Sequence, residues 1–173
     1  MSYYVVDVES DGPVPVMNSM VCFGAVRVTD DLKDTFYGKT KPISDIWQPE
    51  ALSISGFSRE EHEGFDDPKG VMQLFYDWIM ETNGSGRPTM FSDNIAYDWQ
   101  WINYYFHFYL GKNPFGWSGR RIGDVYCGIK GDPYAKWKYL RKTAHTHDPV
   151  DDAKGNAEAL LAIRDMGIKF KFK

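Results

Sequence analysis

The N-terminal part of the chain alternates short apolar runs with turn residues, a pattern typical of β-strands. Residues 3–8 (YYVVDV) are apolar and β-branched, as expected of a buried central strand. Two further runs follow at 20–28 and 34–40, and residues 29–31 (TDD) supply the turn between them. Three strands in close succession predict an antiparallel meander.

Farther along, apolar residues recur with the period of an α-helix. The clearest case is 69–82, where one face collects apolar side chains at i, i+3, i+4, i+7 and i+8: Val71, Leu74, Phe75, Trp78 and Ile79. We expect a strand at 88–93 and a second helix at 97–110. A short helix at 133–142 and a last helix at about 149–166 complete the prediction.

This order of elements predicts an α/β fold in which a central mixed sheet is flanked by helices. The length favours a single domain over 1–173. Residues 168–173 (IKFKFK) alternate apolar residues with lysine. Two interpretations stay open for them: an edge strand protected by its lysines, or a frayed terminus.

Composition and charge argue against a membrane protein, a secreted protein and a protein that coats nucleic acid. No apolar run approaches the ~20 residues of a membrane helix, and the N-terminus lacks the pattern of a signal peptide. We therefore expect a cytoplasmic protein, with no membrane partner, in which Cys22 and Cys127 are buried thiols. The net charge of −4 argues against coating nucleic acid by bulk charge, although bound metal ions would offset it.

Three segments carry acidic or histidine side chains that require an explanation. Asp7 and Glu9 lie two residues apart, so they face the same side of the first strand. Burying two carboxylates is costly unless they are paired or bind metal. Asp98 lies on the stripe of the second helix that should face the sheet, while His147 and Asp152 flank the start of the last helix. Taken singly, each group has a simpler interpretation, as solvated acids or as charges that favour a helix N-terminus.

Together, the three segments resemble a known family. The order is D-x-E at 7–9, N-x-x-Y-D at 94–98 and H-x4-D at 147–152. This resembles the DEDD exonuclease superfamily, in the branch whose third motif contains histidine (DEDDh). The similarity covers nearly the whole chain, and the third motif is the most specific. The chain is most similar to small stand-alone members grouped with a mycobacterial 3′–5′ exoribonuclease.

The resemblance implies a ribonuclease H-like fold and hydrolysis of single-stranded nucleic acid from a 3′-hydroxyl end, releasing nucleoside 5′-monophosphates. Asp7 would bridge two Mg²⁺ or Mn²⁺ ions, with Glu9 and Asp152 completing the first site. Asp98 would help to hold the second ion, and His147 would be the general base. RNA is the expected substrate on the strength of these relatives alone. A single-stranded DNA exonuclease and an inactive nucleic-acid-binding module are the alternatives.

Further substrate contacts are expected at seven positions: Ser10, Gly12, Leu52, Ile54, Asn94, Lys138 and Arg141. The last two lie in the run 132–145, where basic and aromatic residues alternate in a way that suits a single strand and its bases. A solvated amphipathic helix is the alternative for this run, and core packing is the alternative for the two apolar positions. Asp11 departs from the family pattern by adding negative charge beside the first motif.

The helix 97–110 carries aromatic side chains on more than one face. Exposed apolar patches usually mark partner surfaces, and aromatic residues are enriched in interface cores. Small relatives in this family are often dimers, so we predict a homodimer with this helix in or near its interface. The alternative is that residues 111–145 fold back over the helix.

Overall fold

One mixed sheet organises the molecule in the computed structural model, which describes residues 2–167. Its strand order is β3-β2-β1-β4-β5, formed by β1 (Tyr3–Ser10), β2 (Met20–Arg27), β3 (Thr35–Lys39), β4 (Thr89–Ser92) and β5 (Arg120–Arg121). The first three strands are antiparallel neighbours, whereas β4 runs parallel to both β1 and β5. The predicted sheet, a meander followed by parallel strands, is confirmed. The two interpretations of 168–173 fall outside the described residues.

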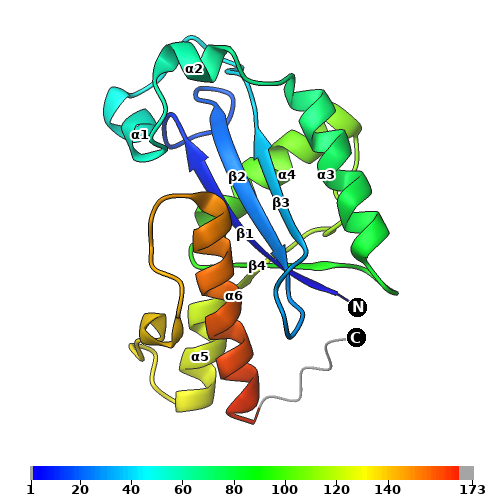
Figure 1. Cartoon of the computed structure of the whole chain (residues 1–173), viewed down its shortest axis with the longest axis vertical. Coiled ribbons are helices and arrows are strands. Elements are labelled where there is room, and N and C mark those ends of the chain that lie inside the picture. Colours follow the sequence, from blue (N-terminus) through cyan, green and yellow to red (C-terminus); the bar gives the residue numbers. More distant parts are fainter. Residues whose placement is uncertain (1, 168–173) are drawn as a thin grey trace.

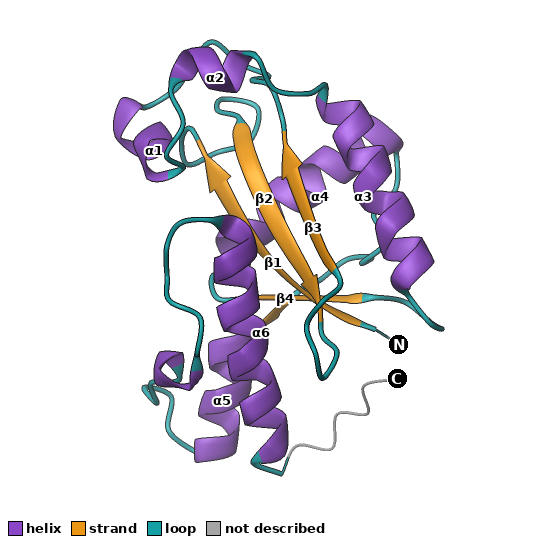
Figure 2. Cartoon of the chain, viewed as in Figure 1, coloured by secondary structure: helices purple, strands orange, loops and turns teal. Residues whose placement is uncertain are grey.

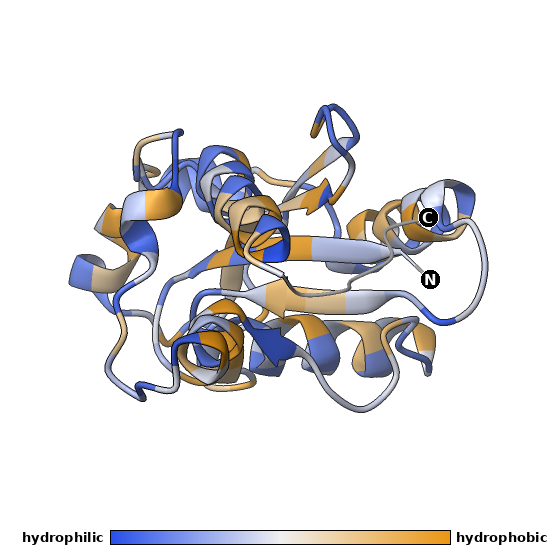
Figure 3. Ribbon diagram, turned by 90° about the horizontal axis from the view of Figure 1, so that it is seen from below, coloured by the Kyte–Doolittle hydropathy of each residue, from blue (hydrophilic) through white to orange (hydrophobic). Residues whose placement is uncertain are grey.

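Helices cover both faces of this sheet (Figures 1 and 2). The elements are α1 (Pro49–Ile54), α2 (Arg59–Glu63), α3 (Pro68–Thr82), α4 (Ile95–Leu110), α5 (Ile122–Lys130), the 3₁₀ turn η1 (Lys138–Leu140) and α6 (Pro149–Asp165). One core layer lies between the sheet and α3 with α4, and a second lies between the sheet and α5 with α6. Viewed from below, helices lie on either side of the strands (Figure 3).

Alternation along β1 divides its side chains between these two layers. Tyr4, Val6 and Val8 pack in the layer of α3 and α4, whereas Val5 packs in the layer of α5 and α6. Asp7 and Glu9 follow Val5 at two-residue steps, so they face the side of the sheet that α6 covers. The acids of the central strand thus lie on one face, beyond Val5, and the opposite face is apolar.

The predicted helix at 133–142 is wrong. Only Lys138–Leu140 form a 3₁₀ turn there, and the regular helix of this region is α5, ten residues earlier in the chain. Ile122 and Tyr126, one turn apart in α5, are buried in the second core layer. Gly131 ends the helix with φ 64°, a conformation that glycine adopts without strain. The basic and aromatic residues after it mostly face solvent and form no continuous apolar stripe.

The aromatic helix α4 is covered on one side only. Trp101, Tyr105 and Phe106 are fully buried, and Phe115 folds back onto Phe106 with ring centroids 6.3 Å apart. Phe108 remains 65% exposed. The alternative of a chain that folds back over the helix therefore holds for one face. Among residues 2–167, no helix is long and apolar enough to cross a membrane.

Candidate active site

A glycine in β2 lets the last helix approach the sheet at the acidic end of β1. Gly24 is the antiparallel partner of Asp7. A Cβ atom at Gly24 would lie 2.3 Å from the backbone carbonyl of Pro149, so only glycine allows this contact. The first turn of α6 therefore lies directly on β2. Asp148 caps it by accepting hydrogen bonds from the N–H groups of Val150 and Asp151.

This approach brings Asp152 to the two acids of β1. One carboxylate oxygen from each of Asp7, Glu9 and Asp152 lies within 4.8 Å of the others. Asp152 is fully buried. A register shift between Glu9 and Ser10 then ends the regular pairing of β1. Such irregularities commonly re-aim side chains next to active sites.

Asp98 reaches the same region from the other layer. β4 pairs with β1 only through the register positions of Tyr3 to Val5. Beyond them, the N–H of Val8 donates to Asp98 Oδ1 at 3.1 Å, so the carboxylate takes the place of a strand partner. Asp98 is 3% exposed, and it lies in the first turn of α4.

The acids of this cluster repel one another and are shielded from water. Burial, reinforced by the charges of Asp98, Glu9 and Asp152, raises the pKa of Asp7 well above its ordinary value. Burial also raises the pKa of Glu9 to about 7 and that of Asp98 to about 7. Among the described residues, no Lys, Arg or His forms an ion pair with Asp7 or Asp98. Buried carboxylates without a cationic partner are the donor set that a hard divalent cation requires.

Asp152 differs from Asp7 and Asp98 because the chain itself supplies cationic partners for it. Arg141 Nη2 donates to Asp152 Oδ1 at 2.8 Å, and His145 Nδ1 lies 2.7 Å from Oδ2. Burial raises the pKa of Asp152, but these hydrogen bonds outweigh it and leave the pKa below its ordinary value. Gly155 makes room for the guanidinium, since a Cβ there would lie 2.5 Å from Arg141 Nε.

His147 lies at the rim of the cluster and is held by its backbone. Its N–H donates to Asp152 Oδ2 at 3.0 Å, and its φ is 63°, a strained value for a residue with a side chain. The ring is half-exposed, with Nδ1 3.7 Å from Glu9 Oε1. The imidazole therefore faces both solvent and the carboxylates.

The residues expected to contact substrate fall into two groups. Ile54, Asn94 and Lys138 are exposed, and the side chain of Asn94 does not cap α4. Four others are engaged within the chain. The Ser10 hydroxyl bonds the Gly12 carbonyl and the Tyr97 hydroxyl, Gly12 packs against Asn18, Leu52 is buried in a small core, and Arg141 binds Asp152.

Asp11 does not present its charge to a substrate. Its side chain is fully buried, Arg59 Nη1 lies 3.1 Å from its Oδ2, and it accepts a hydrogen bond from the Ser19 N–H. The expected extra negative charge beside the first motif is therefore neutralised within the chain. Cys127 also differs from the expectation, since it is only partly buried, whereas Cys22 is buried as predicted.

Two features of the site were missed in the sequence. A glycine inside an apolar strand often marks close approach of another backbone, so Gly24 carried a readable signal. The pairing of Arg141 with Asp152 had none, because nothing in the spacing shows that this arginine crosses α6 above Gly155 instead of facing solvent.

Known proteins share both the sequence and the architecture of this chain. A protein from Escherichia coli named 3′–5′ DNA exonuclease Cap18 is 35% identical over 178 residues, which is 96% of this chain and 93% of that protein. The nuclease domain of 3′hExo, described as a DEDDh family member bound to rAMP, superposes with a TM-score of 0.79 at 17% identity. That match covers 99% of this chain and 96% of the domain.

A second solved structure extends the likeness of fold. E. coli ExoI, in a complex with single-stranded DNA and zinc, matches with a TM-score of 0.70 at 18% identity. The match covers 95% of this chain but 40% of ExoI. A scan of protein-family models finds none that matches the chain.

Proposed function

The chain belongs to the DEDDh superfamily of 3′–5′ exonucleases, and we propose that it shortens single-stranded DNA from the 3′ end by metal-dependent hydrolysis. The observation that carries this proposal is the convergence of Asp7, Glu9 and Asp152 within 4.8 Å, with Asp98 buried beside them. The chain is thus an exonuclease by family.

The four carboxylates fit a pair of divalent cations. Asp7, Glu9 and Asp152 would hold one ion, and Asp98 would help to hold the other together with Asp7. Mg²⁺ or Mn²⁺ bound there would polarise the attacking water and neutralise charge on the transferred phosphate. This set of oxygen donors suits those ions better than soft metals.

His147 would act as the general base. It would take a proton from the water that attacks the last phosphodiester. The bond from phosphorus to the 3′-oxygen of the preceding nucleotide then breaks, and that oxygen takes up a proton. The products are a nucleoside 5′-monophosphate and a strand one nucleotide shorter with a new 3′-hydroxyl. The exposed ring and the backbone bond to Asp152 leave the imidazole free to do this.

The sequence resemblance suggested RNA as the substrate, but the E. coli relative is named a DNA exonuclease. We prefer DNA because this relative is 35% identical to the chain over nearly all of both proteins. Digestion of matched single-stranded DNA and RNA oligomers with Mg²⁺ or Mn²⁺ tests this assignment. We expect faster release of deoxynucleoside 5′-monophosphates. Equal or faster hydrolysis of RNA would contradict this assignment and indicate an exoribonuclease.

The exposed aromatic face of α4 supports the proposal that the chain forms a homodimer. Phe108 stacks on Tyr104 with centroids 5.3 Å apart and is 65% exposed, next to the half-exposed Val16 loop. A second copy related by a two-fold axis would cover these rings. Light scattering on the parent and on Phe108→Glu tests it: a dimer that the substitution dissociates supports this interface, and a monomeric parent refutes it.

A further inference from the structure

A pocket lies between α5 and the segment that follows it, on the side of the sheet that α6 covers. Its volume is about 310 Å³, within the range of pockets that bind small ligands. The lining comes from β5, α5 and the segment after α5, and it includes Arg121, Tyr134, Lys136, Trp137 and Lys138. Trp137 packs in the core layer of α5 and α6, which is the layer that Asp7 faces.

Strand register fixes how near this pocket is to the proposed catalytic centre. Val5 of β1 pairs with Phe91 of β4, and Phe91 pairs with Arg120 of β5. β4 ends at Ser92, and Asp93 follows directly at the end of that strand. Adjacent strands are about 4.8 Å apart, so β5, which supplies Arg121 to the pocket lining, lies about 10 Å from β1 across the sheet.

Two cations connect the pocket to this edge of the site. Lys138 Nζ lies 2.6 Å from Asp93 Oδ2, and Arg121 Nε donates to the carbonyl of Asp93 at 3.2 Å. Arg121 also pairs with the exposed Asp124 at 3.0 Å. The Arg121–Asp124 pair is exposed, and such pairs contribute about 0–1 kcal/mol, so Arg121 can exchange a carboxylate for a phosphate at little cost. In the other pair Lys138 is exposed, whereas Asp93 is partly buried.

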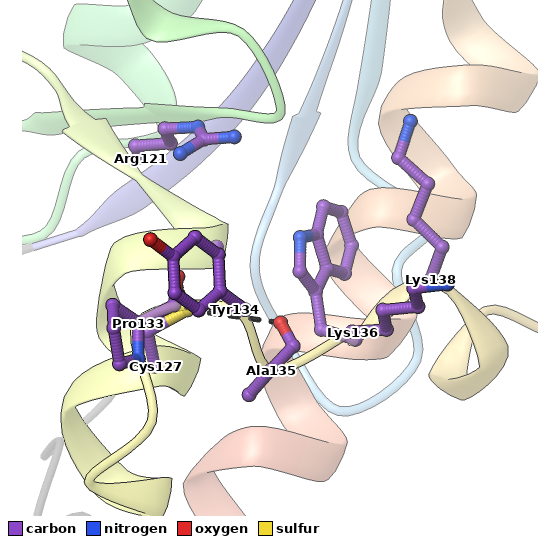
Figure 4. A pocket seen from close by; sticks show the side chains of 9 residues that line it. Arg121, Cys127, Pro133, Tyr134, Ala135, Lys136 and Lys138 are labelled. Carbon is purple, nitrogen blue, oxygen red and sulfur yellow. Dashed lines mark hydrogen bonds between the residues drawn. The ribbon is translucent and has the colours of Figure 1, made fainter.

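The pocket also offers a free cation and a free aromatic ring. Within residues 2–167, Lys136 takes part in no ion pair, and it is exposed. Tyr134 is 87% exposed, with no hydrogen bond from its hydroxyl to another described residue. Figure 4 shows the Tyr134 ring beneath Arg121, with Lys138 on the other side of the opening. An exposed ring among cations, one of them without an ion pair, is the combination that binds a single strand by stacking and charge.

We propose that this pocket binds the upstream nucleotides of the strand whose 3′ end lies at the carboxylates. One base would stack on Tyr134, and neighbouring phosphates would contact Lys136, Lys138 and Arg121. The inference rests on the proposed function and deepens it, because it assigns a second contact region that only strands of several nucleotides can reach. Substrates of one nucleoside would not use it.

The test compares a short and a long substrate on the same variants. The short substrate is the p-nitrophenyl ester of thymidine 5′-monophosphate, and the long one is a dodecamer of thymidylate. Tyr134→Ala should raise KM for the dodecamer roughly 5- to 100-fold, as expected for the loss of one stacked base. Its kcat on the dodecamer and both constants for the ester should stay at parent values. Tyr134→Phe keeps the ring and should behave like the parent.

A charge variant gives an independent readout. Lys136→Ala should reduce the salt dependence of dodecamer affinity by about 0.7 in the slope of log K against log salt. Lys130→Ala, an exposed lysine outside the pocket lining, should leave that slope unchanged.

Parent-like KM for the dodecamer in Tyr134→Ala would overturn the inference while leaving the exonuclease assignment intact. An equal loss on the ester and the dodecamer would also overturn it, because the defect would then lie in the catalytic centre. A parent protein that hydrolyses neither substrate would overturn the proposed function and this inference with it.

Discussion

Replacing Asp98 by asparagine should stabilise the metal-free chain while it removes a proposed metal ligand. Burial raises the pKa of this carboxyl from an ordinary 3.8 to about 7, even though the Val8 N–H donates a hydrogen bond to it. At about 1.4 kcal/mol per pH unit, folding with Asp98 ionised costs up to about 4 kcal/mol. An asparagine can keep the bond to the Val8 N–H without the charge.

The direction in which stability changes with pH follows from the protons that the folded and unfolded chains bind. Between pH 3.8 and about 7, the folded chain holds a proton at Asp98 that the unfolded chain has released. The stability of the parent therefore falls as pH rises through this window and levels off above it. The advantage of Asp98→Asn should be small near pH 4 and largest above pH 7. Because Asp7 shares the same cluster and takes up part of the proton binding, we expect about 1–4 kcal/mol.

Thermal unfolding in EDTA from pH 5 to pH 8.5 measures this difference. For a chain of this size the gain corresponds to a rise in Tm of about 2–15 °C above pH 7. Asp151→Asn is the matched control, since Asp151 is an exposed acid next to Asp152 in the first turn of α6. It should lose about 0.3–1 kcal/mol of helix-dipole stabilisation. If Asp98→Asn is no more stable than the parent at pH 8, the buried charge of Asp98 does not destabilise the metal-free chain.

Three further predictions concern the same site. His147→Ala should lower kcat about 10²–10⁴-fold, with Mn²⁺ binding by calorimetry unchanged; near-parent turnover at pH 7 would remove the general-base assignment. Gly24→Ala should displace α6, which should lower activity and cost about 1–3 kcal/mol of stability. Gly70→Ala is the control, because Gly70 has open space around it and the change should leave activity intact. Equal activity in the two variants would show that α6 does not need a glycine at position 24. Metal affinity should rise with pH through about 7, where Glu9 ionises, and a flat calorimetric profile from pH 6 to pH 8 would contradict the raised pKa.

The regular elements of the fold were predictable because their hydrophobic periods are strong. The alternation of β1 placed Asp7 and Glu9 on one face, and the apolar stripe of α4 placed Asp98 against the sheet. Both predictions agree with the observed layers. The short elements α1, α2 and α5 were missed, since nine residues or fewer give too few turns for a helical period to stand out.

The electrostatic partners within the site were less predictable, because they depend on contacts between distant segments. Arg141 and Lys138 belong to one basic run in the sequence, yet one is buried on Asp152 and the other reaches Asp93 at the edge of the sheet. The neutralisation of Asp11 by Arg59 joins residues 48 positions apart. Sequence patterns identify such charges but not their partners.

We propose that the carboxylate site of this chain hydrolyses single-stranded DNA from its 3′ end. It is tested most directly by digesting a 5′-labelled single strand with Mn²⁺, using the parent, Asp7→Ala and the parent in excess EDTA. We expect a ladder of labelled products that shortens with time for the parent alone, and intact strand in the other two reactions. Immediate release of the label as a mononucleotide, or an undiminished ladder with Asp7→Ala or EDTA, would contradict it.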